Sequence, residues 1–208
     1  MLRSEAVHAF AIRPGADSIC NVAIVLASAS QRRAELLRGM GVTFEIVAST
    51  VEEVTGGDLT AWDVAVTNAC RKAISVAETH RDATVIGADT VVALGNRLFG
   101  KPTDANEAAT MLGELSGKTH EVTTGVCLTH RSTGELTVLA ETTRVTFHSL
   151  TPQQVRDYID RVHVRDKAGA YAIQEHGDAL VRKISGSLTN VIGLPVERLR
   201  EVLRRSSD

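Results

Sequence analysis

The stretch VIGADTVVALGNRLFGKP, from Val85 to Pro102, decides how the chain folds. Its first half is a run of strand-forming residues, which is typical of a β-strand buried on both faces. Asp89 lies within this run, and a buried carboxylate is costly unless it is hydrogen-bonded, paired with a cation or bound to a metal ion. We therefore expect Asp89 either to have a local structural role or to lie at a strand end that opens on a cleft.

The segments on either side of this strand alternate between helical and strand patterns. Short strands are expected at 21–28 and 43–50, and apolar residues at helical spacing predict helices at 30–41 and 60–80. Further along, the patterns predict a helix from Asp104, a β-hairpin turning at RSTG (131–134), and helices from Thr151 and Pro195. This order of elements predicts an α/β fold with one mixed, twisted sheet and flanking helices.

The 208 residues suffice for one sizeable core or for two small lobes that share a sheet. The formal net charge of -2 offers no general basic surface for nucleic acid, and no apolar run approaches membrane-spanning length, so we expect neither nucleic-acid nor membrane binding. Cys20, Cys70 and Cys127 match no disulfide or metal-ligand spacing, which favours a reducing, cytoplasmic location. We expect residues 1–22 to form an N-terminal extension and residues 23–208 to form a single domain.

Several cations stand in positions suited to phosphate groups. Arg32 and Arg33, in LASASQRRAEL, fall in the first turn of a predicted helix, where the helix dipole attracts anions. Lys101 follows the central stretch, and Lys167 lies in RDKAGAYAIQ, whose small residues allow another group to approach the backbone closely. Each cation alone is typical of a solvated surface, but together with Asp89 they indicate a polyphosphate and metal site.

Five motifs follow one another between Ile24 and Leu203: LASASQRRAEL, GADTVVALGNRLFGKP, LSGKTHEVTTGV, DKAGAYAIQ and VIGLP. Together they resemble the signature motifs of the Maf family of nucleoside triphosphate pyrophosphatases. Gln31 stands where the family usually has proline, which removes a rigid helix start but no charge. The resemblance implies a Maf/ITPase-like fold, with two lobes around a central cleft.

The resemblance also implies an activity, namely hydrolysis of a nucleoside triphosphate to the monophosphate and pyrophosphate with a divalent metal ion, Mg²⁺ or else Mn²⁺. It identifies Asp89 as the catalytic carboxylate, acting as general base or metal ligand, with Glu35 and Glu53 as further candidate metal ligands. Lys72 is a candidate to hold phosphates, and the alternative is a position on the solvated face of its helix. The relatives imply a homodimer. The candidate substrate-binding residues are Ser28, Arg32, Arg33, Lys72, Thr90, Lys101, Lys167 and Gln174.

Three of these positions concern the base of the nucleotide. The family branch that acts on dTTP and UTP resembles this chain at Arg32, Thr90 and Gln174, whereas the branch that acts on 7-methyl-GTP tends to have Trp, Gln and Glu there. Hydroxyl and amide groups suit a neutral pyrimidine, while a cationic methylated guanine suits an aromatic ring and a carboxylate. We therefore expect dTTP and UTP as substrates. The alternatives are 7-methyl-GTP or another modified nucleotide, or a nucleotide-binding regulator of cell division with little turnover.

Overall fold

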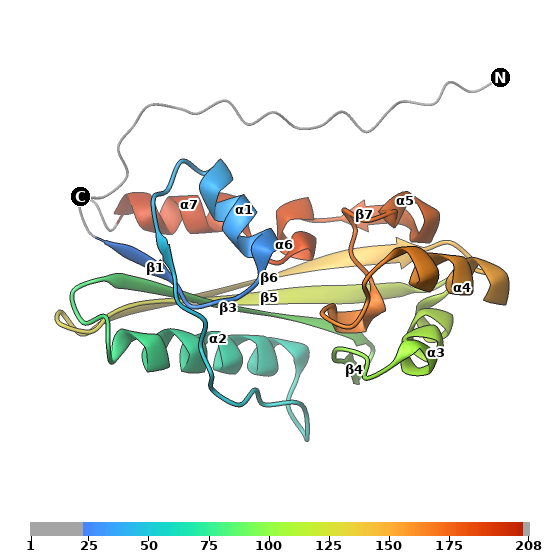
Figure 1. The fold of residues 1–208 in the computed structure, drawn as a ribbon, viewed down its shortest axis with the longest axis horizontal. Helices are drawn as coiled ribbons and strands as arrows, with labels where there is room; N and C mark the ends of the chain where they lie inside the picture. The colour runs from blue at the N-terminus through green and yellow to red at the C-terminus, as the bar shows by residue number, and fades with distance from the viewer. Residues whose placement is uncertain (1–22, 206–208) are drawn as a thin grey trace.

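The computed structural model describes residues 23–205, so the predicted N-terminal extension lies outside the described residues. The chain forms a twisted sheet with helices on both faces (Figure 1). The strands are β1 (Ile24–Leu26), β2 (Glu45–Ile46), β3 (Thr84–Leu94), β4 (Arg97–Phe99), β5 (Thr119–His130), β6 (Glu135–Phe147) and β7 (Val181–Ser185). Their order is β2-β1-β3-β5-β6-β7, with β4 paired to β3. β1 is parallel to β2 and β3, and the other pairs are antiparallel, which confirms the predicted mixed sheet.

The helices begin largely where the sequence predicts them. They are α1 (Gln31–Gly39), α2 (Ala61–Ala77), α3 (Ala105–Leu115), α4 (Pro152–Arg161), α5 (Gly177–Leu180), α6 (Leu188–Ile192) and α7 (Val196–Arg205), with a 3₁₀ turn η1 (Ala168–Ala170). Ser30, Asp104 and Thr151 each accept a hydrogen bond from the backbone N–H three residues on, as helix N-caps do. Within the described chain, no helix combines the length and apolar character needed to span a membrane.

One predicted strand is much shorter than expected. The pattern at 43–50 predicts a full strand, but only Glu45 and Ile46 pair with β1. Both residues are exposed at the edge of the sheet, where a second neighbouring strand is lacking among the described residues. The predicted length of this strand was therefore wrong. A run of β-forming residues at an open sheet edge has few ladder hydrogen bonds to extend it.

Two glycines let α2 lie directly on the sheet. A Cβ on Gly87 of β3 would stand 2.2 Å from the carbonyl oxygen of Ala69, and a Cβ on Gly125 of β5 would stand 2.6 Å from that of Ala65. Real Cβ atoms do not approach backbone this closely, so only glycine permits this packing. As a consequence, the polar side chains on the same face of α2 come within reach of β3.

The buried apolar residues form cores in two lobes along the sheet (Figure 1). The first lobe contains β1, α1, α2 and α7, and its largest fully buried side chains include Leu26, Leu37 and Leu199. The second lobe contains β4, α3, α4 and η1, around Phe99 and Phe147. This division confirms the two-lobed architecture that the resemblance implied.

Between the lobes, one edge of β3 is open. β1 pairs with β3 only from Thr84 to Ile86, and β4 pairs with it only from Val92 to Leu94. Among the described strands, residues 87–91 of β3 have a neighbour only on the β5 side. Asp89 lies in the middle of this interval, so the prediction that it stands at a strand end was wrong. The opening arises because the neighbouring strand β1 has already ended.

Candidate active site

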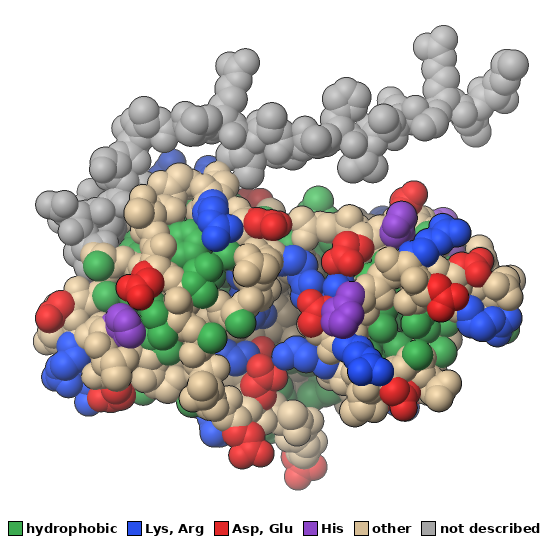
Figure 2. All heavy atoms as spheres, viewed as in Figure 1, with side chains coloured by type: hydrophobic (Ala, Val, Ile, Leu, Met, Phe, Trp, Pro, Cys, Tyr) green, Lys and Arg blue, Asp and Glu red, His purple; other side chains and the backbone are tan. Residues whose placement is uncertain are grey.

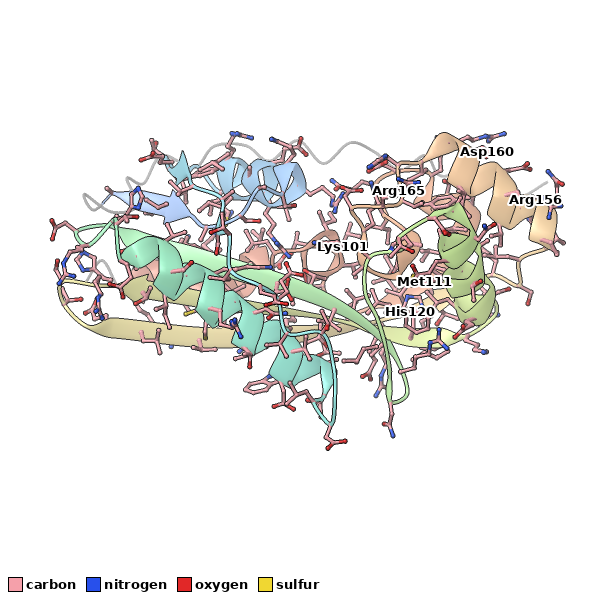
Figure 3. All side chains as sticks on the ribbon, turned by 60° about the horizontal axis from the view of Figure 1, so that its bottom comes forward. Lys101, Met111, His120, Arg156, Asp160 and Arg165 are labelled. Carbon is pink, nitrogen blue, oxygen red and sulfur yellow. The ribbon has the colours of Figure 1, made fainter. Side chains whose placement is uncertain are left out.

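A cavity of about 540 Å³ lies between the two lobes at the open edge of β3. Figure 2 shows Lys and Arg side chains, with Asp and Glu side chains among them, gathered around the hollow in the middle of this face. Figure 3 shows Lys101 near the middle of the molecule, whereas Met111 and His120 lie in the second lobe. The predicted site residues that line the cavity are Ser28, Arg32, Arg33, Glu53, Lys72, Asp89, Thr90, Lys101, Lys167 and Gln174.

Glu35 is the one predicted site residue that does not line the cavity. It lies on α1, where its position in the helix is exposed. Its helical neighbour Ala34 points into the core of the first lobe, and consecutive residues of a helix face different directions. Because Glu35 does not share the cavity with Asp89, it does not enter the site described below.

Asp89 is held from two sides by side chains of α2. Asp89 is 8% exposed as a residue. Its Oδ1 accepts a hydrogen bond from Lys72 Nζ at 2.8 Å. Oδ2 accepts from Asn68 Nδ2 at 3.0 Å. Asn68 and Lys72 are four residues apart and therefore share one face of the helix. Lys72 is buried against the sheet and lines the cavity, so it does not take the alternative position on a solvated face of α2.

Lys72 also joins Asp89 to a second carboxylate. Its Nζ lies 2.7 Å from Oε1 of Glu53, and Lys101 Nζ lies 3.8 Å from the same oxygen. Burial on its own raises the pKa of Glu53, but the hydrogen bond and charge of Lys72, with the charges of Lys101 and Arg33, outweigh it. The net result is a lowered pKa, which keeps Glu53 ionised at neutral pH.

Asp89 and Glu53 thus meet at the ammonium of Lys72, and both carboxylates line the cavity. Mg²⁺ in phosphate-transfer sites is typically held by one or two carboxylates, with substrate phosphates and water completing its ligands. Within residues 23–205, no group of three or more His, Cys, Asp and Glu side chains is arranged to hold a metal ion. The donor set therefore fits an ion that is held jointly by protein and substrate, rather than by the protein alone.

Arg33 is fixed at the N-terminal turn of α1 by three acceptors. Its Nε donates to the carbonyl of Gly193 at 2.9 Å, Nη1 to Ser28 Oγ at 3.2 Å, and Nη2 to Thr90 Oγ1 at 3.0 Å. Burial lowers the pKa of Arg33, and the negative charge of Asp89 counteracts part of this effect. An arginine nevertheless stays charged in proteins, so a rigid cation faces the cavity at the N-terminus of α1.

A second set of charges connects the lobes across the cavity. Lys167 is 4% exposed and donates to Asp166 Oδ1 at 2.8 Å and to the His163 carbonyl, and lies 3.2 Å from Glu175 Oε1. The other oxygen of Asp166 accepts from Arg32 Nη1 at 3.1 Å. Burial raises the pKa of Asp166, but the hydrogen bond and charge of Lys167, followed by those of Arg32, lower it overall. Asp166 therefore links a helix of the first lobe to a lysine of the second.

The structure adds residues that the motifs alone did not single out. Asn68 contacts Asp89 directly and also bonds both backbone groups of Val54. A polar residue one turn before Lys72 on an otherwise apolar helical face was a usable signal for it. Gly193 contributes only its backbone carbonyl, which accepts a hydrogen bond from Arg33. The hydroxyl of Thr124 reaches that of Thr90 because the two residues are paired in neighbouring strands. No sequence pattern indicates such contacts, since they depend on how distant segments pack.

Together, the fold and the site define the class of protein: an α/β protein with one mixed sheet and a cation-lined cavity between two lobes. The fold is similar to the solved structure of the Staphylococcus aureus Ham1 protein, with a TM-score of 0.52 and 16% identity over 88% of this chain and 99% of that chain. The chain belongs to the Maf family, because the family model described as "Maf-like protein" matches residues 23–206. This finding confirms the resemblance on which the site residues were chosen.

Individual relatives are considerably more similar. A protein of Pelotomaculum thermopropionicum named dTTP/UTP pyrophosphatase is 44% identical over 182 residues, which cover 88% of this chain and 95% of the relative. A protein of Bacillus cytotoxicus with the same name is 45% identical over 181 residues, which cover 87% and 94%. The similarity therefore extends over nearly the whole length of both chains.

Proposed function

We propose that this protein is a nucleoside triphosphate pyrophosphatase that hydrolyses dTTP and UTP to the monophosphate and pyrophosphate. The observation that carries the proposal is Asp89, a buried carboxylate held by Lys72 and Asn68 at the wall of a cation-lined cavity. The names of the relatives at 44% identity and above support the same activity.

The cations of the cavity suit a triphosphate. Arg33 and Ser28 lie at the N-terminus of α1, while Lys101 and Lys167 approach from the second lobe. Negative charge on the phosphate chain is offset best by cations that are already oriented before the substrate binds. Lys167 is held by carboxylates in the free protein, so phosphate oxygens would add to these partners or replace them.

The reaction requires a water molecule to attack the α-phosphorus and pyrophosphate to leave. We propose Asp89 as the group that accepts the proton of this water or holds the metal ion, with Glu53 as a second metal ligand. Lys72 lowers the pKa of Glu53, which keeps that carboxylate ionised, and it holds both carboxylates in place. The ion is Mg²⁺, with Mn²⁺ as the alternative, and when bound it supplies positive charge against the phosphate oxygens.

The base is proposed to contact Arg32, Thr90 and Gln174, which all line the cavity. The side-chain amide of Gln174 has no hydrogen-bond partner among residues 23–205, so a donor and an acceptor are both available to uracil or thymine. Arg32 would repel the positive charge of a methylated guanine. UTP and dTTP should therefore be hydrolysed well ahead of 7-methyl-GTP, and Gln174→Glu should reduce this preference.

A panel of nucleoside triphosphates with Mg²⁺, assayed separately for pyrophosphate and orthophosphate, tests the proposal. Attack on the α-phosphorus predicts pyrophosphate and the monophosphate, without a diphosphate intermediate. Release of orthophosphate with accumulation of UDP would exclude the pyrophosphatase reaction. Preference for 7-methyl-GTP would overturn only the choice of base. Tight nucleotide binding without any turnover would favour the regulator of cell division.

We also propose that the protein acts as a homodimer, as the sequence resemblance implies, and in the cytoplasm, as the cysteine spacing favours. Large apolar side chains are exposed on the isolated chain, among them Trp62 at 53% and Leu136 at 55%. A second copy could cover part of this surface. Light scattering after size-exclusion chromatography should give twice the chain mass, and a monomer at micromolar concentration would contradict the proposed assembly.

A further inference from the structure

Two linked hydroxyl groups, those of half-buried Thr90 and buried Thr124, lie behind Arg33. Thr90 of β3 and Thr124 of β5 are direct partners in the sheet, so their side chains stand on the same face. Their Oγ1 atoms are 3.0 Å apart, and Thr124 is fully buried. Thr124 Oγ1 also lies 3.0 Å from the backbone carbonyl of Asn190, while Thr90 Oγ1 lies 3.0 Å from Arg33 Nη2.

The groups at the two ends of this chain determine where every proton points. The Asn190 carbonyl can only accept, so the single hydroxyl proton of Thr124 is donated to it. The guanidinium of Arg33 can only donate, so Thr90 Oγ1 accepts from it. The hydroxyl proton of Thr90 must therefore point to Thr124. All three hydrogen bonds run in one direction, an arrangement in which each bond polarises and strengthens the next.

Both ends of the network are attached to one turn of backbone. Arg33 Nε donates to the carbonyl of Gly193, which directly follows α6, and Thr124 donates to Asn190 within α6. The Asn190 side chain is itself fully buried, and its Nδ2 donates to the Val122 carbonyl and to Thr143 Oγ1, both at 2.9 Å. The turn that holds Arg33 is thereby fastened to β5 and β6.

We propose that Thr124 is a positioning residue, which acts through Thr90 to hold the guanidinium of Arg33 in the orientation that binds phosphate. Three of the five N–H groups of Arg33 are bound by Ser28, Thr90 and Gly193. One N–H on each terminal nitrogen has no hydrogen-bond partner among residues 23–205, which leaves two donors for phosphate oxygens. The inference rests on the proposed function of Arg33 as a phosphate ligand.

The network also limits what Thr90 can offer a nucleotide. Its only proton is directed to Thr124, so Thr90 can accept a hydrogen bond from the substrate but cannot donate one. The sequence alone left both roles open. Without the Thr124 hydroxyl, Thr90 would lose its acceptor and could rotate, and Arg33 would lose a directed partner.

Binding of inorganic tripolyphosphate tests the inference independently of catalysis. Affinity is measured by calorimetry in metal-free buffer for the wild type, Thr124→Val, Thr124→Ser and Arg33→Met. Thr124→Val should weaken binding about tenfold, because a misoriented Arg33 loses about one charge-assisted hydrogen bond to the phosphate. Thr124→Ser keeps the hydroxyl and should bind within about threefold of the wild type. Since Thr124 acts through Arg33, adding Thr124→Val to Arg33→Met should cause no further loss.

Thr123 provides a matched control. It is the next residue of β5, is also buried, and its hydroxyl lies 2.9 Å from Thr142 Oγ1 on the other face of the sheet. Thr123→Val should leave tripolyphosphate affinity unchanged. Equal losses in Thr123→Val and Thr124→Val, or a further loss from Thr124→Val in the Arg33→Met background, would overturn the inference.

Two further outcomes keep the inference separate from the proposed function. If Thr124→Val does not fold, Thr124→Ala replaces it with the same expected loss, and failure of both to fold would show that the hydroxyl serves the fold and not Arg33. Absence of pyrophosphate release from every nucleotide would refute the proposed activity. It would leave the tripolyphosphate result intact, because that measurement needs no turnover.

Discussion

Replacing Lys72 by methionine should destabilise the fold in a manner that depends on pH. The substitution keeps most of the side-chain volume but leaves Asp89 and Glu53 without their shared cation. The side chains of Lys72 and Asp89 are each 11% exposed, so this pair is nearly shielded from solvent. Removing one partner of a buried ion pair typically costs about 3–5 kcal/mol.

Two features place Lys72→Met at the lower end of that range. Asn68 still donates to Asp89 in the variant, and the side chain of Glu53 is 35% exposed, so water can solvate its charge. We therefore expect a loss of about 3 kcal/mol in the free energy of unfolding at pH 7, measured by urea denaturation. Lys101→Met is the matched control, since Lys101 is 56% exposed and 3.8 Å from Glu53, and it should cost about 0.5 kcal/mol or less.

The pH dependence follows from the lowered pKa of Glu53. Burial alone would raise this pKa, but Lys72 reverses the effect, so folding is favoured by ionised Glu53. That contribution is present above the ordinary glutamate pKa of 4.5 and is lost as the pH falls through the lower folded value. The gap between wild type and Lys72→Met should therefore shrink below pH 4.5. A gap that is equally large at pH 7 and pH 3.5, or absent at pH 7, would refute this reasoning.

Three further predictions concern catalysis and packing. Asp89→Asn should reduce pyrophosphate release about a hundredfold or more while circular dichroism stays native, and near-normal turnover would remove Asp89 from the mechanism. Lys101→Ala deletes a cation proposed to touch only the triphosphate, so kcat/KM should fall by similar factors for UTP and dTTP, and a loss confined to one base would contradict this role. Gly87→Ala should cost about 3 kcal/mol of stability because its Cβ meets the Ala69 carbonyl, whereas Gly113→Ala, with open space around its Cβ, should be neutral or stabilising in thermal unfolding.

The sequence alone predicted the features that depend on near neighbours along the chain. Ser30, Asp104 and Thr151 were recognisable as helix starts because a capping residue bonds a backbone group only three positions away. The β-hairpin turning at residues 131–134 was recognisable for the same reason, as it joins β5 and β6 directly. The five motifs also identified most of the side chains that line the cavity, since family motifs preserve residue identity and spacing.

Only the tertiary structure decided how these side chains are combined. Asp89 and Thr90 are consecutive in β3 and point to opposite faces of the sheet, Asp89 toward α2 and Thr90 toward Arg33 of α1. They line one cavity because neither β1 nor β4 pairs with residues 87–91, which leaves that edge of β3 open. Where one strand ends beside another depends on pairing between segments distant in sequence. Local periodicity carries no information about which distant segments pair. The sequence therefore indicated which residues form the site, but not how they are arranged in space.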